Sequence, residues 1–193
     1  MYNSFVTSQD ELLKTAFTTL ATASIDELVV DLRYNRGGSV ATAQLLAGLI
    51  AGEHANKVFG KFVFNEKLRA NNLDIDITSS NVNLGLSRVF FLTTKSSASA
   101  SEMTINGLKP YLDVIQIGDQ TEGKDVGSNP FYDYIDSNET KNRNHKYLML
   151  PITFKYYNSE GVGDYSEGVL HNIILRKTLA TLGEIGAVEE PVH

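Results

Sequence analysis

The sequence predicts an α/β domain, a class in which β-strands alternate with α-helices along the chain. Two apolar runs, Leu28–Leu32 and Arg88–Thr94, are typical of strands that helices cover on both faces. Each run is followed by a loop and then by a segment with helical character, Ala41–Ala51 and Ser99–Tyr111. In such a fold the connections between parallel strands are right-handed. Ligands bind near the carboxyl ends of the strands.

The first elements expected are a β-prone run and a helix. The run is Tyr2–Val6, and the helix should cover Gln9–Ala21, where apolar residues recur at helical spacing. Ser8 and Glu11 form the capping-box pattern at the start of this helix. One face of the helix should therefore pack on a core.

Further elements follow from the same rules. Strands are expected at Leu28–Leu32, Val58–Phe64, Leu73–Ile77, Arg88–Thr94, Val114–Ile117 and Tyr147–Tyr157. Glycine-containing loops are expected at Asp119–Ser128 and Ser159–Asp164. Asp133–Lys146 is expected to be an exposed polar excursion, and Glu189–His193 a frayed end.

Composition narrows the possible functions before any motif is considered. The 193 residues carry 17 Lys and Arg against 23 Asp and Glu, a formal charge of −6, and they include no cysteine. An acidic balance without a basic stripe argues against a nucleic-acid partner. The missing thiols exclude cysteine nucleophiles and thiolate metal sites. A chain of this length can bury a full core, so we expect one domain over residues 1–193.

No segment predicts insertion into a membrane. The most apolar run, Leu45–Gly52, is much shorter than the ~20 residues that cross a bilayer. The first residues, MYNSFVTSQDE, lack the basic, apolar and small-residue order of a secretory signal. We therefore expect no targeting signal in this chain.

Two loops lie where an α/β fold places ligand sites, each directly after an apolar strand. The first is Arg33–Gly38. Its paired glycines allow backbone N–H groups to turn outward, and two such donors can hold a developing oxyanion. A simple tight turn is the alternative interpretation. Asp31 and Arg33 share a strand face, which favours a structural ion pair.

The second loop, Lys95–Met103, alternates small residues with serines ahead of a predicted helix. A serine at a helix N-terminus lies at the positive end of the helix dipole. Ser99 and Glu102 also form a capping-box pattern, so Ser99 could instead bond a backbone N–H. The pattern alone leaves both roles open.

A serine nucleophile needs a base, and histidine is the usual one. Three histidines have unsuitable positions, at a surface helix end (His54), in the polar excursion (His145) and at the chain end (His193). His171 stays a candidate. Burial can also keep a lysine amine neutral, so that it serves as the base. Lys124, between two glycines in a loop, is that candidate, although a loop lysine is commonly a solvated charge.

Three short motifs occur in order along the chain. They are DLRYNRGG at Asp31–Gly38, SASASE at Ser97–Glu102 and TEGK at Thr121–Lys124. Together they resemble the carboxyl-terminal processing peptidases, or tail-specific proteases, and the match runs from about Tyr2 to Asn172. In that family the middle serine of SASASE precedes the motif lysine by 25 residues, the interval that separates Ser99 from Lys124 here.

The resemblance implies a fold, a reaction and a role for each matching residue. The fold would be a Clp-protease/crotonase-like α/β core, and the activity that of a serine endopeptidase with a Ser-Lys dyad. Ser99 would be the nucleophile and Lys124 the general base. Backbone N–H groups of Ala100 and of Gly38, or else Gly37, would form the oxyanion hole. No metal or cofactor is implied.

Two segments depart from the family pattern. Ser128 stands four residues after the lysine, where many members carry a glutamine that orients it. Ser128 is therefore the candidate for that task, with a single hydroxyl. GVLHN at Gly168–Asn172 replaces a G-x-x-P-D segment that is common near the last core strand.

The resemblance also implies partners and a location. The substrates would be proteins or peptides bound as an extended strand. Members commonly carry an N-terminal region, often with a PDZ domain, which we do not expect in this chain, and they work in the bacterial periplasm or cell envelope. Two alternatives are a catalytically inactive peptide-binding domain of the same fold and a crotonase-like enzyme that acts on a thioester.

Overall fold

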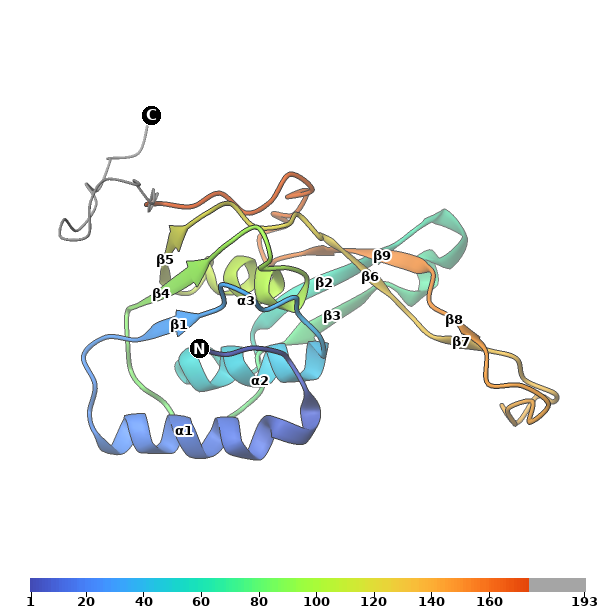
Figure 1. Ribbon diagram of the computed structural model, residues 1–193, viewed down its shortest axis with the longest axis horizontal. Coiled ribbons are helices and arrows are strands. Elements are labelled where there is room, and N and C mark those ends of the chain that lie inside the picture. The colour runs from blue at the N-terminus through green and yellow to red at the C-terminus, as the bar shows by residue number, and fades with distance from the viewer. Residues whose placement is uncertain (174–193) are drawn as a thin grey trace, which may run out of the picture.

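The computed structural model describes residues 1–173 and has a mixed α/β fold (Figure 1). The predicted fold class is thereby confirmed. The α-helices are α1 (Asp10–Thr22), α2 (Val40–Ile50) and α3 (Ala100–Leu108). A parallel sheet with the order β1-β4-β5 is formed by β1 (Val29–Asp31), β4 (Arg88–Thr93) and β5 (Asp113–Gly118).

A second sheet is antiparallel and has the order β3-β2-β9-β6. Its strands are β2 (Val58–Phe64), β3 (Leu73–Asp76), β6 (Val126–Ser128) and β9 (Ile152–Tyr157). Two short strands, β7 (Phe131–Tyr132) and β8 (Leu148–Met149), pair with each other outside both sheets. Three 3₁₀ turns complete the described elements, at Thr7–Gln9, Gly52–His54 and Glu66–Asn71.

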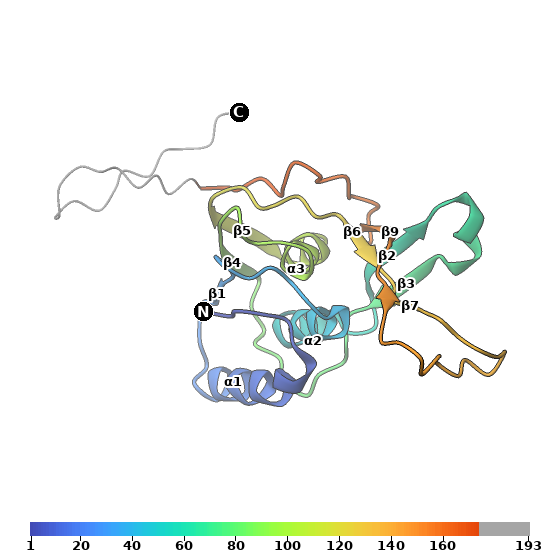
Figure 2. The ribbon, with the colours of Figure 1, turned by 45° about the vertical axis from the view of Figure 1, so that its right-hand side comes forward.

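Helix α3 is the centre of the molecule. All nine of its residues are buried, and it packs on α2 and on strands β2 and β9. Figures 1 and 2 show α1 as an outer layer beyond α2. Because α3 also follows the parallel strand β4, its N-terminus lies at the carboxyl edge of the parallel sheet, where α/β folds place ligands.

The predicted capping box at Ser8 and Glu11 is wrong. Ser8 lies inside the first 3₁₀ turn, and Gln9 is the N-cap of α1 without a side-chain hydrogen bond. The β-prone run at Tyr2–Val6 forms a single parallel bridge, between Phe5 and Gly38, rather than a strand.

Three predicted boundaries also differ from the structure. The loop predicted at Asp119–Ser128 ends in strand β6, which pairs with β9. The strand predicted at Tyr147–Tyr157 is divided into β8 and β9 on either side of Pro151, which has no N–H to donate. The predicted helix Ser99–Tyr111 ends at Leu108, because Pro110 has no N–H to donate to the preceding turn of the helix.

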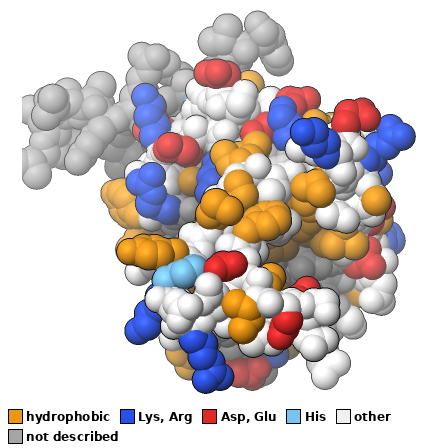
Figure 3. All heavy atoms as spheres, turned by 90° about the vertical axis from the view of Figure 1, so that its right-hand side faces the viewer, with side chains coloured by type: hydrophobic (Ala, Val, Ile, Leu, Met, Phe, Trp, Pro, Cys, Tyr) orange, Lys and Arg blue, Asp and Glu red, His pale blue; other side chains and the backbone are white. Residues whose placement is uncertain are grey.

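The β7–β8 hairpin projects from the body of the molecule, and the predicted excursion Asp133–Lys146 lies at its far end (Figures 1 and 2). Figure 3 faces this side and shows hydrophobic side chains on the surface among charged ones. Large apolar side chains that are exposed in the hairpin include Phe131, Ile135, Tyr147 and Met149. Most of residues 133–146 are exposed, as predicted, and the strands that carry them expose apolar side chains as well.

Among residues 1–173, no helix has the length and apolar character needed to cross a membrane. The frayed end predicted at Glu189–His193 lies outside the described residues.

Candidate active site

The two loops singled out in the sequence lie side by side. Strands β1 and β4 are parallel neighbours, so the loops that follow them leave the same edge of the sheet. The backbone carbonyl of Asn35, in the first loop, accepts hydrogen bonds from Ala98 N–H at 3.0 Å and from Ser101 Oγ at 2.9 Å. The DLRYNRGG motif and the SASASE motif are thus held against each other.

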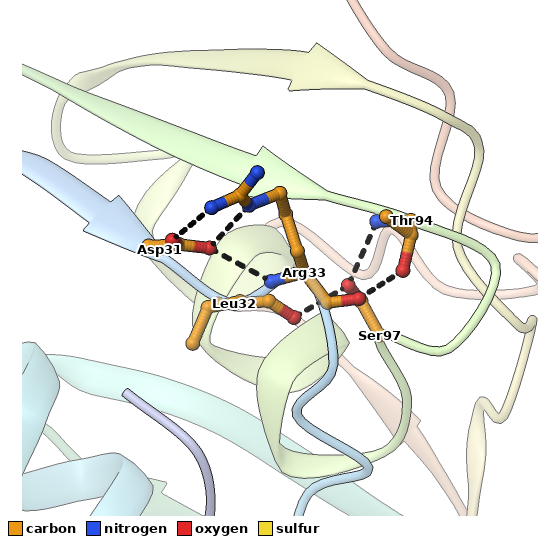
Figure 4. A network of polar contacts seen from close by, with 5 residues as sticks. All are labelled: Asp31, Leu32, Arg33, Thr94 and Ser97. Carbon is orange, nitrogen blue, oxygen red and sulfur yellow. Dashed lines mark hydrogen bonds and ion pairs between the residues drawn. The ribbon is translucent and has the colours of Figure 1, made fainter. Parts of the chain in front are cut away.

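A second set of contacts joins the same loops nearer the sheet (Figure 4). Ser97 Oγ donates to the carbonyl of Leu32 at 2.7 Å and accepts Thr94 N–H at 3.0 Å. Thr94 Oγ1 donates to the carbonyl of Arg33. Since Ser97 and Ser101 are fully buried and both hydroxyls are hydrogen bonded, these serines have a structural role.

The predicted ion pair between Asp31 and Arg33 is present in the same region (Figure 4). The guanidinium bonds both carboxylate oxygens, at 3.0 and 2.9 Å, and Arg33 N–H reaches Asp31 Oδ1 at 3.2 Å. Hydrogen bonding to Arg33 lowers the pKa of the Asp31 carboxyl below its usual value. The pair closes the turn that leads from β1 into the glycine motif.

Ser99 differs from its two neighbouring serines in backbone geometry and position. It lies in the turn between β4 and α3 with φ 57° and ψ −115°, a conformation that a residue with a Cβ rarely adopts. Its hydroxyl-bearing side chain lines a cavity of about 190 Å³. A strained turn from a strand to a helix, with the serine exposed at its tip, is typical of hydrolase nucleophiles.

Lys124 lines the same cavity as Ser99. The predicted residues Gly38, Ala100 and Ser128 also contribute to its wall. Apolar side chains complete the lining, from Val40, Met103, Val126 and Phe154. The cavity wall therefore brings residues of all three motifs together with apolar side chains. Lys124 itself is exposed, so the burial expected of a lysine base is not found.

The two glycines of the first motif have different surroundings. Gly37 has φ 94°, and a Cβ there would come within 2.7 Å of Ser99 Cβ and 2.8 Å of Ala100 N, so only glycine permits this approach. Gly37 N–H donates to Asn35 Oδ1 at 2.8 Å. Gly38 N–H donates to no atom of residues 1–173. Ala100 is the first residue of α3, so its N–H has no acceptor one turn earlier in the helix.

A buried carboxylate connects the serine to the lysine loop. Glu102 is fully buried, and its Oε2 accepts N–H bonds from Ser99 at 2.8 Å and Lys124 at 2.9 Å. Its Oε1 accepts from Gly123 N–H and from Thr121 Oγ1, both at 2.6 Å. The predicted bond from Glu102 to the start of the helix is confirmed, and the same carboxylate holds the whole TEGK turn.

The lysine loop is also anchored on its other side. Asp125 is buried, its carbonyl accepts Tyr156 N–H of β9 at 2.9 Å, and its carboxylate lies 3.7 Å from Lys155 Nζ. Lys155 bonds Asp164 at 2.7 Å, and that bond together with the charge of Asp125 raises the pKa of its amine. The loop is thus tied to α3 by Glu102 and to β9 by Asp125.

The histidines lie elsewhere. The His54 ring lies 5.1 Å from the Tyr111 ring, and His145 contacts Asp133 in the β7–β8 hairpin. His171 does not line the cavity of Ser99 and Lys124. His193 lies outside the described residues. Within residues 1–173, no three or more histidine and acidic side chains form a group that could hold a metal ion.

A family model described as Peptidase family S41 matches residues 1–170. The chain belongs to this family. Among solved structures, an S41 protease from Bacteroides fragilis is 32% identical with a TM-score of 0.76, over 88% of this chain and 44% of that one. The S41 chain therefore spans less than half of that relative. No curated protein matches it.

Two more distant structures share the fold of this S41 chain. One is the photosystem II D1 C-terminal processing protease, 18% identical with a TM-score of 0.67, over 89% of this chain and 40% of that one. The other is a lipoprotein from Streptococcus agalactiae, 16% identical with a TM-score of 0.61, over 91% and 60%. Membership of S41 supports a peptidase role.

Five residues that line the cavity were predicted from the sequence, namely Gly38, Ser99, Ala100, Lys124 and Ser128. Asn35 and Thr121, which help to hold the cavity together, were not. Asn35 belongs to the DLRYNRGG motif and Thr121 to the TEGK motif, and the sequence assigns neither residue a role. Both residues are buried. Asn35 joins two motifs through its backbone carbonyl, which accepts from Ser101 Oγ, whereas Thr121 joins two motifs through its side-chain hydroxyl. A hydrogen-bonding side chain inside a motif, at a position that supplies no chemistry, is the signal for Thr121. The contact of Asn35 leaves no such signal, because any residue at position 35 would offer the same carbonyl.

Proposed function

We propose that this chain is the catalytic core of a serine peptidase that cleaves peptide bonds by acyl transfer, with Ser99 as nucleophile and Lys124 as general base. The observation that carries the proposal is the cavity that residues Ser99 and Lys124 both line. The strained backbone of Ser99 supports it, because such strain is concentrated at functional sites. The structural hydrogen bonds of Ser97 and Ser101 support Ser99 as the reactive serine of the motif.

In the proposed reaction, Ser99 Oγ attacks the carbonyl carbon of the scissile bond while Lys124 Nζ takes the hydroxyl proton. The tetrahedral intermediate collapses, the peptide C–N bond breaks, and Lys124 returns the proton to the leaving amine. Water then attacks the acyl-enzyme ester with Lys124 again as base. Release of the new carboxyl terminus regenerates Ser99.

The negative oxygen of each tetrahedral intermediate is held by the N–H groups of Gly38 and Ala100. Gly38 is favoured over Gly37, because Gly37 N–H already donates to Asn35 Oδ1. Gly38 and Ala100 both line the cavity beside Ser99. One such donor is typically worth about 3 kcal/mol of the activation barrier. Ser128, at the cavity wall, is the side chain proposed to orient Lys124.

The substrate is proposed to be a protein or peptide bound as an extended strand. Strand β6 ends the four-stranded sheet, so its outer edge carries no strand among the described residues. Val126, Gly127 and Ser128 of β6 line the cavity. An extended peptide that pairs with this edge would bring its backbone to Ser99.

The proposal is tested with a fluorophosphonate probe, followed by location of the adduct by mass spectrometry. We expect the adduct on Ser99, and none in Ser99→Ala. Lys124→Ala should label much more slowly than the wild type, while the exposed-residue controls Ser79→Ala and Lys67→Ala should label normally. An adduct on another serine, or equal labelling of Lys124→Ala, would overturn the dyad.

A second candidate function is peptide binding without cleavage. The observation that favours it is Ser128 at the position where many members carry a glutamine. Under this alternative the wild type binds peptides of apolar sequence in the cavity, the probe does not react, and Lys124→Ala leaves binding unchanged.

We also propose that the protein acts outside the cytoplasm, in the cell envelope. The resemblance to envelope proteases and the fold shared with a bacterial lipoprotein support this location. Cell fractionation of the native protein tests it, and recovery with the cytosolic fraction would contradict it.

A further inference from the structure

Thr121 is not part of the cavity wall and has no role in the proposed reaction. Its side chain is buried, and its hydroxyl lies between two parts of the chain. Thr121 Oγ1 is 2.6 Å from Glu102 Oε1 and 2.7 Å from the backbone nitrogen of Val169. Thr121 N–H in turn donates to the Val169 carbonyl at 3.4 Å.

The direction of each hydrogen bond is fixed by chemistry. Val169 N–H can only donate, so the Thr121 hydroxyl accepts that bond and directs its own proton to Glu102. Glu102 then receives four donors, two on each oxygen.

Val169 belongs to a segment, residues 168–173, that lies along the parallel sheet. Ile173 carbonyl accepts Gly118 N–H at 2.9 Å, and Asn172 N–H donates to the Gln116 carbonyl at 2.8 Å. Gly168 has φ 104°, and a Cβ there would lie 2.3 Å from the Thr121 carbonyl. Segment 168–173 therefore packs directly on the turn that carries Thr121.

The same carboxylate that binds Thr121 sets the positions of the two proposed reacting residues. Oε2 of Glu102 bonds the N–H groups of Ser99 and Lys124. Without the hydrogen bond from the Thr121 hydroxyl to Oε1, the buried carboxylate would be free to turn toward its other donors. The backbone N–H groups of Ser99 and Lys124 would then shift with it. A displacement of about 1 Å in an active site can cost 10²-fold in rate.

We propose that Thr121 is a positioning residue. It joins segment 168–173 to Glu102, and through Glu102 it fixes the backbone of Ser99 and Lys124 in the arrangement that the reaction needs. The inference rests on the proposed function for its kinetic consequence, whereas the structural link itself can be measured without activity.

The kinetic test compares Thr121→Val, which removes the hydroxyl, with Thr121→Ser, which keeps it. The matched control is Thr42→Val, because Thr42 is also fully buried and bonds a carboxylate, Asp10 Oδ1 of α1, at 2.9 Å. With a peptide substrate we expect Thr121→Val to lower kcat about 10- to 100-fold with little change in KM. Thr121→Ser should restore most of the rate, and Thr42→Val should retain it.

Two results would overturn the proposal: a wild-type kcat for Thr121→Val, or an equal loss in Thr42→Val or Thr121→Ser. Should Thr121→Val not fold, Thr121→Cys takes its place, since a thiol is a weak donor and acceptor of similar volume.

A second measurement keeps the inference separate from the proposed function. Amide hydrogen exchange of Ser99 and Lys124 should become faster in Thr121→Val but not in Thr42→Val. If the wild type neither cleaves peptides nor reacts with the probe, the proposed function fails, while exchange still decides on the positioning role. Unchanged exchange at both amides would contradict it.

Discussion

Glu102 and Lys124 are joined by a hydrogen bond of 2.9 Å from the lysine backbone N–H to Oε2, and the same oxygen accepts Ser99 N–H at 2.8 Å. One buried carboxylate atom thus links the backbones of the two residues that we propose to react. The sequence predicts Glu102 only as a helix cap. In the structure its other oxygen, Oε1, also binds Thr121 and Gly123 of the TEGK turn, so the same side chain holds both halves of the site.

Replacement of Glu102 by glutamine should damage both stability and reactivity. A glutamine amide has only one acceptor atom, so its NH₂ group would face two of the four donors that Glu102 now satisfies. Buried donors without an acceptor cost about 1–3 kcal/mol. Urea unfolding should show a loss of that size, and the rate of fluorophosphonate labelling should fall. The exposed Glu66→Gln is the control, and a labelling rate for Glu102→Gln equal to that control would contradict the linking role.

Gly37 should tolerate no side chain. In Gly37→Ala the new methyl group would lie 2.7 Å from Ser99 Cβ, and the residue would keep a φ of 94°. Gly85→Ala is the matched control, since its φ is 62° and nothing lies within 4 Å of the added Cβ. Gly85→Ala should lose about 1 kcal/mol from the backbone alone. Gly37→Ala should lose more in thermal unfolding and should also fail to label, and equal losses in the two variants would show that the contact with Ser99 is unimportant.

Much of this arrangement could be predicted from the sequence, because local patterns carried it. The apolar runs that became β1 and β4 are continuous, and the helix after each begins where small residues and a cap occur. The motif interval between Ser99 and Lys124 selected two residues that line one cavity. These features depend on neighbours in sequence or on spacing within motifs.

The parts that were missed depend on contacts between distant residues. Val126–Ser128 became a strand because β9 pairs with it, and no property of three residues with a central glycine indicates that. The role of Glu102 in the lysine loop needs a contact across 22 residues. Ser8 was expected to cap a helix, but a 3₁₀ turn precedes α1 and moves the cap to Gln9. Tertiary contacts of this kind override local preference.

Ser99 should carry a measurable cost in stability. Its backbone conformation, φ 57° and ψ −115°, is strained for a residue with a Cβ, by about 1–3 kcal/mol. Ser99→Gly should therefore have a free energy of unfolding about 1 kcal/mol higher than Ser99→Ala, although neither variant can react with the probe. Denaturant unfolding of the pair measures the difference. Identical stabilities would mean that the turn is not strained.

The ion pair between Asp31 and Arg33 should contribute stability that depends on pH. Because Arg33 lowers the pKa of Asp31 in the folded state, the contribution is complete above the ordinary aspartate pKa of about 3.9 and is lost as pH falls through the lowered folded value. Arg33 is half exposed, so the contribution should be under about 1 kcal/mol. Urea unfolding of the wild type and Asp31→Asn from pH 7 to pH 2 should therefore show a difference at neutral pH that shrinks in acid. A difference that stays constant across this range would assign the effect of Asp31 to its packing and hydrogen-bond geometry instead of its charge.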